Sequence, residues 1–309
     1  MLQGAALKSH LQKLSDKYGF IAVGVAAARK LTEEEDRLKS WLEKGYHGTM
    51  QYMENHFEKR LDPTLLVPGA KTVISFLYNN YPDGRQNTNA PKVAKYAWGE
   101  DYHRVIKDKL YDLVAELQTV SVPFEGRIFV DSAPVMERQW ATLAGLGWTG
   151  KNSLLLRKGV GSYFFIATII CDLELEPDSP VSSHCGTCTA CIDACPTKAI
   201  VQDGVIDATK CISYLTIERK SDIPEAFQQK MEGFVFGCDI CQDVCPWNQF
   251  STPHTEPRFN AGDWINWDFK AWQNMDTSAF EVQFGKSAIT RAGYTKIRET
   301  LDFISPQNK

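Results

Sequence analysis

The sequence lacks a long apolar stretch, and its amino terminus lacks the character of a secretion signal. Residues 1–20 space their apolar side chains as an amphipathic helix does and contain no uninterrupted apolar core. No segment approaches the roughly 20 apolar residues that a membrane-spanning helix requires. We therefore expect a cytoplasmic protein with no membrane partner.

The chain also lacks an excess of either charge and two common phosphate-binding loops. Lys and Arg (34) nearly balance Asp and Glu (38), so the formal net charge is only −4 and any nucleic-acid-binding surface must be local. The glycine-rich segment Gly145–Ser153 is not a Walker loop, because the GKS/T order is missing. It is not a dinucleotide fingerprint either, because it follows a predicted helix rather than a strand.

Cysteine, by contrast, is abundant and concentrated. Eight of the nine cysteines lie between residues 185 and 245, in the runs CxxCxxCxxxCP and CxxCxxxCP with Cys211 between them. This is the spacing of bacterial ferredoxins with two four-iron clusters, in which the fourth cysteine of each run binds the other cluster. The first predicted cluster has the ligands Cys185, Cys188, Cys191 and Cys245, and the second has Cys195, Cys211, Cys238 and Cys241.

Zinc and disulfides explain this pattern less well. A structural zinc site needs only four ligands and does not require three cysteines at a spacing of three. Disulfides need an oxidising compartment, which nothing in the sequence suggests. Cys171 lies in an apolar run and is expected to be an inert buried thiol.

The remaining pattern predicts an α+β protein. Residues 1–180 alternate helices and strands, and the turn at residues 158–161 between Ser153–Arg157 and Tyr163–Cys171 predicts a hairpin, so the sheet is mixed rather than purely parallel. We expect a mixed-sheet α/β domain over residues 1–180 and a two-cluster ferredoxin-like domain over residues 181–250. An aromatic-rich extension follows over residues 251–309.

Asp131 is the strongest catalytic candidate outside the cysteines. It follows the predicted strand Arg127–Val130 and precedes a loop towards a helix, where α/β sheets often build their sites. Asp131 or Ser132 could equally cap the helix that begins near Pro134. The residues alone leave both interpretations open.

Three further segments carry weaker signals. The glycines near Gly150–Ser153 allow backbone amides to approach a polar ligand, but they also suit a helix end followed by a turn. Lys95–Arg104 mixes aromatic and cationic side chains, although a loop entering a helix explains it more simply. Val282–Arg298 contains four cations and suits a nucleic-acid contact or a solvated helix face.

Taken together, four segments resemble the epoxyqueuosine reductases, nearly from the first helix to about Tyr294. These segments are KYAWGEDYH, FVDSAPVMERQWATLAGLGWTGKNSLLL, HCGTCTACIDACPTKAI and FGCDICQDVCPWN. The family is similar in architecture to reductive dehalogenases, with a cobalamin-binding α/β domain joined to a two-cluster ferredoxin domain. The resemblance implies an oxidoreductase that reduces epoxyqueuosine to queuosine in the anticodon wobble position of tRNA.

The resemblance also implies roles for individual residues. Asp131 would be the proton donor to the epoxide oxygen. The cobalamin-binding candidates are Ala94, Asp131, Gly150, Lys151, Asn152, Ser153, Phe236 and Gly237. The tRNA-binding candidates are Tyr102, His103, Arg104, Arg138, Arg219 and Lys220. Electrons would come from a low-potential donor such as a ferredoxin or flavodoxin, and the protein would act as a monomer.

Two departures from expected patterns qualify this interpretation. Asp101 and His103 begin the cobalamin signature DxHxxG, but Ile106 replaces the glycine, so a base-off cobalamin without a histidine ligand is expected. The helical HEAT-like repeats found in many family members are expected to be missing here. The alternatives are a dehalogenase-like corrinoid reductase acting on a small molecule, and a ferredoxin-type electron-transfer module without cobalamin.

Overall fold

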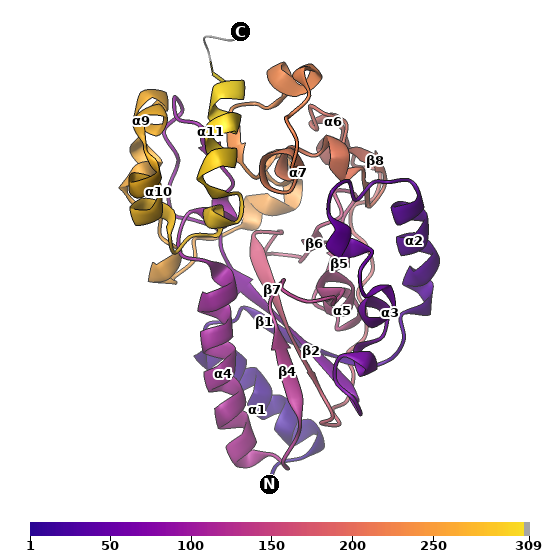
Figure 1. Cartoon of the computed structure of the whole chain (residues 1–309). Helices are drawn as coiled ribbons and strands as arrows, with labels where there is room; N and C mark the ends of the chain where they lie inside the picture. Colours follow the sequence, from indigo (N-terminus) through magenta and orange to yellow (C-terminus); the bar gives the residue numbers. More distant parts are fainter. Residues whose placement is uncertain (306–309) are drawn as a thin grey trace.

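A four-stranded sheet forms the centre of the first half of the chain in a computed structural model that describes residues 1–305 (Figure 1). The strand order is β1-β2-β7-β4, and every pairing in this sheet is antiparallel. The strands are β1 (Ala22–Ala27), β2 (Thr72–Asn79), β7 (Phe164–Cys171) and β4 (Gly126–Phe129). The α+β class expected from the sequence is confirmed, but this sheet is antiparallel throughout rather than mixed, because each of its strands runs opposite to its neighbours.

Helices cover both faces of this sheet, which is why its two central strands are almost continuously apolar. Leu7 of α1 and Val105 of α4 share one core with Phe76 of β2, whereas Trp140 of α5 packs with Leu77 on the opposite face. The helices are α1 (Gly4–Lys17), α2 (Thr32–Glu43), α3 (Phe57–Leu61), α4 (Tyr102–Val120) and α5 (Glu137–Leu143).

The hairpin expected around residues 158–161 is wrong. The short strand β6 (Leu155–Leu156) pairs with β5 (Trp148–Thr149), and across the turn there is one isolated bridge between Arg157 and Gly161. The physical reason is that β2 and β4 already pair with the two edges of β7. Residues 153–157 therefore have no free edge of β7 with which to pair.

The cysteine-bearing part lies beyond one end of the sheet and consists of short elements (Figure 1). It contains α6 (Ala190–Asp193), β8 (Ile200–Gln202), β9 (Val205–Ile206), α7 (Ile212–Ile217), β10 (Phe234–Phe236) and α8 (Ile240–Asp243). β10 pairs in parallel with β3 (Lys92–Val93), a segment of the first half. This pairing joins the two parts of the chain through backbone hydrogen bonds.

The aromatic-rich segment after residue 250 packs into the same core as the sheet. Phe259 makes edge-on contacts with Tyr78 and Phe165, and Trp272 stacks on Phe284 at a centroid distance of 5.3 Å. The helices of this segment are α9 (Phe269–Asn274), α10 (Thr277–Phe284) and α11 (Gly293–Phe303). Residues 306–309, the end of the expected extension, lie outside the described residues. Among the helices of residues 1–305, none is long and apolar enough to cross a membrane.

Candidate functional site

Asp131 lies in the loop that follows β4, and it does not cap α5. The helix begins six residues later at Glu137, and its N-cap position is Met136 without a side-chain cap. The backbone of Asp131 adopts a left-handed conformation with φ of 45°. Its N–H donates to the Glu137 carboxylate, with N–O distances of 3.1 and 3.0 Å. Because a non-glycine residue at positive φ is costly unless its surroundings hold it, this geometry favours a functional position.

Tyr102 orients the Asp131 side chain. Its hydroxyl donates to Oδ2 of Asp131 at 2.5 Å, a length typical of a charge-assisted hydrogen bond. The Tyr102 ring is buried between His103 and Phe165, each with a centroid distance of 4.1 Å. Burial, together with the neighbouring Asp131, raises the pKa of Tyr102, so the tyrosine keeps its proton. Tyr102 was expected to contact tRNA, but it has no free ring face on which a base could stack.

Two further charged residues of α5 complete the surroundings of Asp131. Burial and the nearby Asp131 raise the pKa of Glu137, whereas burial lowers the pKa of Arg138. Nη1 of Arg138 donates to the carbonyl oxygen of Ser153 and, at 3.3 Å, to its hydroxyl. The candidate turn at Ser153 is thereby attached to the helix that follows Asp131.

Four more side chains converge on this region from distant segments, and the sequence did not identify them as a group. Arg291 binds the Glu218 carboxylate at 2.7 Å and lies over the Tyr52 ring, with its guanidinium carbon 5.8 Å from the centroid. Burial raises the pKa of Tyr52 and of Tyr96, and the Asp131 carboxylate contributes in both cases. No local motif links these positions; only the cationic character of residues 282–298 pointed towards Arg291.

The other predicted nucleic-acid contacts are in varied surroundings. Asp101 caps α4 and also binds Nδ1 of His103 at 2.6 Å. Arg219 donates from Nε to the carbonyl oxygen of Asp222 at 2.8 Å, which fixes its side chain. Arg104 and Lys220 are exposed. The guanidinium group of Arg104 and the ammonium group of Lys220 are therefore accessible to a phosphate.

The first predicted set of cysteines surrounds one cavity. Cys185, Cys188, Cys191 and Cys245 all line a cavity of about 330 Å³. Nε1 of Trp148 donates to Sγ of Cys185 at 3.4 Å. Lys151 and Asn152, which are expected to line the corrinoid, also line this cavity. The structure thus brings together the four ligands that the spacing assigns to one cluster and leaves space between them.

The second predicted set is also brought together. Burial raises the pKa of Cys238 to about 12, and neighbouring Cys211 and Cys195 contribute. Burial likewise raises the pKa of Cys241, with contributions from Cys211, Cys238 and Cys195 among others. Thiols in such surroundings become ligands when a metal displaces the proton. Within residues 1–305, no three His, Cys, Asp or Glu side chains converge as ligands of a single metal ion.

Ala94 and Gly237, two cobalamin-binding candidates, contact each other. The N–H of Ala94 donates to the carbonyl oxygen of Phe236 at 2.8 Å. Gly237 has φ of 67°, and a Cβ added there would lie 2.5 Å from the Cβ of Ala94. Only glycine therefore fits at this contact, which lies next to the cluster ligand Cys238.

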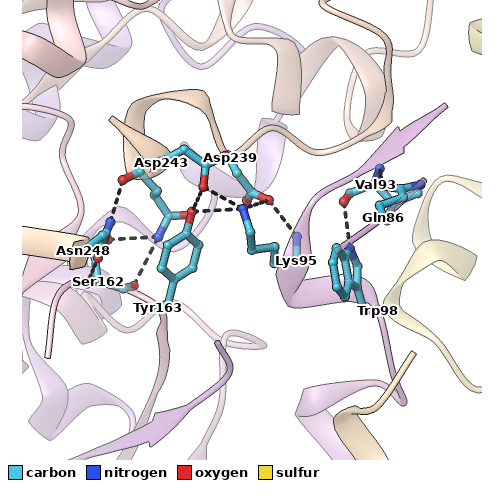
Figure 2. Close-up of polar contacts among 10 residues, drawn as sticks. Gln86, Val93, Lys95, Trp98, Ser162, Tyr163, Asp239, Asp243 and Asn248 are labelled. Atoms are coloured by element: carbon cyan, nitrogen blue, oxygen red, sulfur yellow. Dashed lines mark hydrogen bonds and ion pairs between the residues drawn. The ribbon is translucent and has the colours of Figure 1, made fainter. Parts of the chain in front are cut away.

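Lys95, which follows Ala94 in the sequence, is attached to the cysteine-bearing loop by a partly buried network of hydrogen bonds (Figure 2). Its backbone N–H donates to Oδ2 of Asp239 at 2.8 Å, and its Nζ donates to Oδ1 of Asp243 at 2.6 Å. The Tyr163 hydroxyl also donates to Oδ1 of Asp243. Burial acts to lower the pKa of Lys95, but Asp239 and Asp243 raise it overall.

Two family models match parts of the chain, and a curated relative matches nearly all of it. Residues 184–248 match a family model described as a 4Fe-4S double cluster binding domain, and residues 60–132 match the model "Epoxyqueuosine reductase QueG, DUF1730". The chain is 52% identical over 306 residues to the epoxyqueuosine reductase of Cyclobacterium marinum, covering 97% of this chain and 98% of that protein.

Solved structures agree with these matches. A crystal structure of epoxyqueuosine reductase with an epoxyqueuosine-modified tRNA-Tyr stem loop has a TM-score of 0.87 at 31% identity, covering 96% of this chain and 80% of that one. A structure of the Bacillus subtilis enzyme, with its catalytic aspartate loop swung out of the active site, has a TM-score of 0.88 at 29% identity. It also covers 96% of this chain and 80% of that one.

Proposed function

This chain belongs to the epoxyqueuosine reductase family, and we propose that it reduces epoxyqueuosine to queuosine in the anticodon wobble position of tRNA. The observation that carries the proposal is the arrangement at Asp131, a carboxyl group held by the Tyr102 hydroxyl in a strained loop. Two iron–sulfur clusters lie in the same chain.

The reaction removes the epoxide oxygen and leaves an alkene. It consumes two electrons and two protons and releases one molecule of water. Protonated Asp131 donates one proton to the departing oxygen, and water supplies the second, so the oxygen leaves as water. The Tyr102 hydroxyl stabilises the carboxylate that Asp131 becomes, and solvent protonates it again before the next turnover. Tyr102 holds Oδ2 of Asp131, and Glu137 holds its backbone N–H, so both residues fix the position from which the proton is given.

The eight cysteines between Cys185 and Cys245 would hold two clusters, which would supply single-electron transfer from an external low-potential donor, such as a ferredoxin or flavodoxin. Cobalamin, when bound, supplies the strongly reducing centre at which the two electrons are delivered. The residues present fit such a group. The closely packed pair Ala94 and Gly237 is adjacent to the segment that carries the predicted cluster ligand Cys238. The Arg138–Ser153 pair is adjacent to the segment that carries Asp131. Gly150, Lys151, Asn152 and Phe236 complete the cobalamin contacts, and Lys151 and Asn152 also line the cavity between the ligands of the first cluster.

Recognition of the tRNA is local. Tyr52 takes the stacking role first assigned to Tyr102, because the residue is 45% exposed and Arg291 lies beside its ring. A base stacked on an aromatic ring contributes roughly 1–3 kcal/mol, so a few such contacts suffice for an acidic protein. Arg104 and Lys220 bind phosphates from exposed positions. We propose that this activity is cytoplasmic, because its substrate is a tRNA and its cysteines are thiols that can serve as cluster ligands.

The experiment that tests this function starts with anaerobic reconstitution of both clusters and addition of cobalamin. The reduced protein is incubated with an epoxyqueuosine-containing tRNA stem loop, and the digested nucleosides are analysed by mass spectrometry. Queuosine should accumulate up to the amount of enzyme or beyond it, and a cob(II)alamin EPR signal should appear when the bound cobalamin is reduced by one electron. Failure to form queuosine under strong reduction, with clusters and cobalamin bound, would contradict the proposal.

A further inference from the structure

We propose that Lys95 tunes the reduction potential of the second cluster, the one assigned to Cys195, Cys211, Cys238 and Cys241, by placing a fixed positive charge among two carboxylates of its binding loop. The inference rests on the iron–sulfur clusters and on no property of the tRNA substrate. It makes Lys95 a positioning residue for the electron relay, because its ammonium acts through the loop rather than on the substrate.

The two carboxylates lie inside the cysteine motif itself. Asp239 stands between Cys238 and Cys241, and Asp243 stands between Cys241 and Cys245. Any cluster held by these cysteines therefore has two aspartates as close neighbours along the chain. A cluster gains negative charge when it is reduced, so uncompensated carboxylates beside it oppose reduction.

Lys95 is the cation that compensates them. Its Nζ lies 2.6 Å from Oδ1 of Asp243 and 3.6 Å from Oδ2 of Asp239 (Figure 2). The side chain of Asp239 is only 6% exposed and that of Lys95 is 19% exposed. Water screens charges poorly in such surroundings, so the charge of Lys95 acts more strongly than that of an exposed lysine.

The ammonium is also held in one place. Nζ of Lys95 donates to the Tyr163 hydroxyl at 3.3 Å and lies 5.1 Å from the centroid of that ring. Tyr163 is 4% exposed and lies just before β7, one of the two central strands of the sheet. The backbone N–H of Lys95 fixes the same loop by donating to Asp239. A charge held at one position makes a constant contribution to the reduction potential of the cluster. The contribution of a mobile charge would change with its distance from the cluster.

The test is an EPR-monitored redox titration of the protein carrying both clusters, without cobalamin and without tRNA. Lys95→Met should make the midpoint potential of one cluster more negative, so that less of it is reduced at a fixed dithionite potential. Lys95→Arg keeps the charge and should stay close to the wild-type midpoint. Lys92→Met is the matched control, because Lys92 lies three residues earlier, is exposed and is not part of this network.

A second variant keeps the idea testable if Lys95→Met binds its clusters poorly. Asp243→Asn removes one of the opposing charges from a half-exposed position, and the midpoint should move in the opposite direction, becoming less negative. Repeating the titrations in Cys185→Ser, which lacks a ligand of the first cluster, assigns the shift to the second. Unchanged midpoints in Lys95→Met, or shifts of the same sign in both variants, would overturn the proposal. Because no tRNA is present, these outcomes are independent of queuosine formation.

Discussion

Replacing Asp131 with asparagine tests the proton-donor role most directly, because it removes the acidity and changes little else. The asparagine side chain is almost the same size, and its carbonyl oxygen can accept the hydrogen bond that the Tyr102 hydroxyl donates at 2.5 Å. Asparagine also tolerates the left-handed backbone at φ of 45° better than most residues do. The loop, the clusters and tRNA affinity should therefore be retained.

The expected loss follows from the contribution of a positioned acid. General acid catalysis typically contributes about 10²–10⁴-fold, which corresponds to about 3–5 kcal/mol at 1.36 kcal/mol per tenfold. Tyr102→Phe removes only the charge-assisted hydrogen bond, which contributes about 1.5–3 kcal/mol, so its rate should fall by no more than roughly 10- to 150-fold. Asp131→Asn should accordingly be the slower variant.

The assay is a single-turnover reaction with enzyme in excess over the modified stem loop, followed by quantification of queuosine. Iron content and the visible spectrum check that the clusters are in place, and fluorescence anisotropy of a labelled stem loop checks binding. If Asp131→Asn turned over within a few-fold of wild type, or if Tyr102→Phe were slower than it, the reasoning about Asp131 would be refuted.

Three further predictions concern the clusters and the frame that holds them. Cys245→Ser should lose the first cluster although it belongs to the second cysteine run, leaving about half of the roughly eight iron atoms in an iron assay and one cluster signal in EPR. Gly237→Ala should lower the free energy of unfolding by about 1–3 kcal/mol, because its Cβ would meet that of Ala94 at 2.5 Å; adding Ala94→Gly should restore only the steric part, as denaturant unfolding would show. Burial acts to raise the pKa of Glu256, but the lowering contributions, of which the hydrogen bond with Lys109 is the largest, together outweigh burial and bring that pKa from 4.5 to about 2. The ion pair between these two residues therefore stabilises the fold above pH 4.5, and this stabilisation is lost as the pH falls towards 2. Glu256→Gln should therefore be less stable than wild type by about 1–2 kcal/mol at pH 7, once solvent screening of the ion pair is allowed for, and the difference in unfolding free energy should narrow between pH 4.5 and 2.

Local patterns in the sequence predicted the long elements well. The apolar spacing from Val105 to Leu117 and the β-rich run from Thr72 placed α4 and β2 to within a residue or two. The hairpin at residues 158–161 failed because its pairing depends on which strands occupy the edges of β7. That choice is made by residues up to about 100 positions away along the chain, and no local turn signal contains it.

The site was predictable where a residue carries its own chemical signature and not where it depends on assembly. Asp131 was identifiable because a carboxylate ends a strand, and the cysteines because their spacing is rigid. Tyr102 was singled out from the sequence as a tRNA contact. Burial of its ring leaves only the hydroxyl available, and this hydroxyl binds Asp131. The pairing of Tyr52 with Arg291 joins residues from opposite ends of the chain and has no signal in either segment.

The joint between β3 and β10 constrains how the protein is made as well as how it works. The first strand is synthesised about 140 residues before the second, and Leu7 and Leu301 belong to the same hydrophobic core. Contacts so distant in sequence form late and slowly. While the ribosome is still translating the last helices, the α/β half has an incomplete core, because those helices contribute residues to it. Iron and sulfur can therefore reach the cysteine loop before the core is complete, and a chain that receives no clusters would be expected to be protease-sensitive.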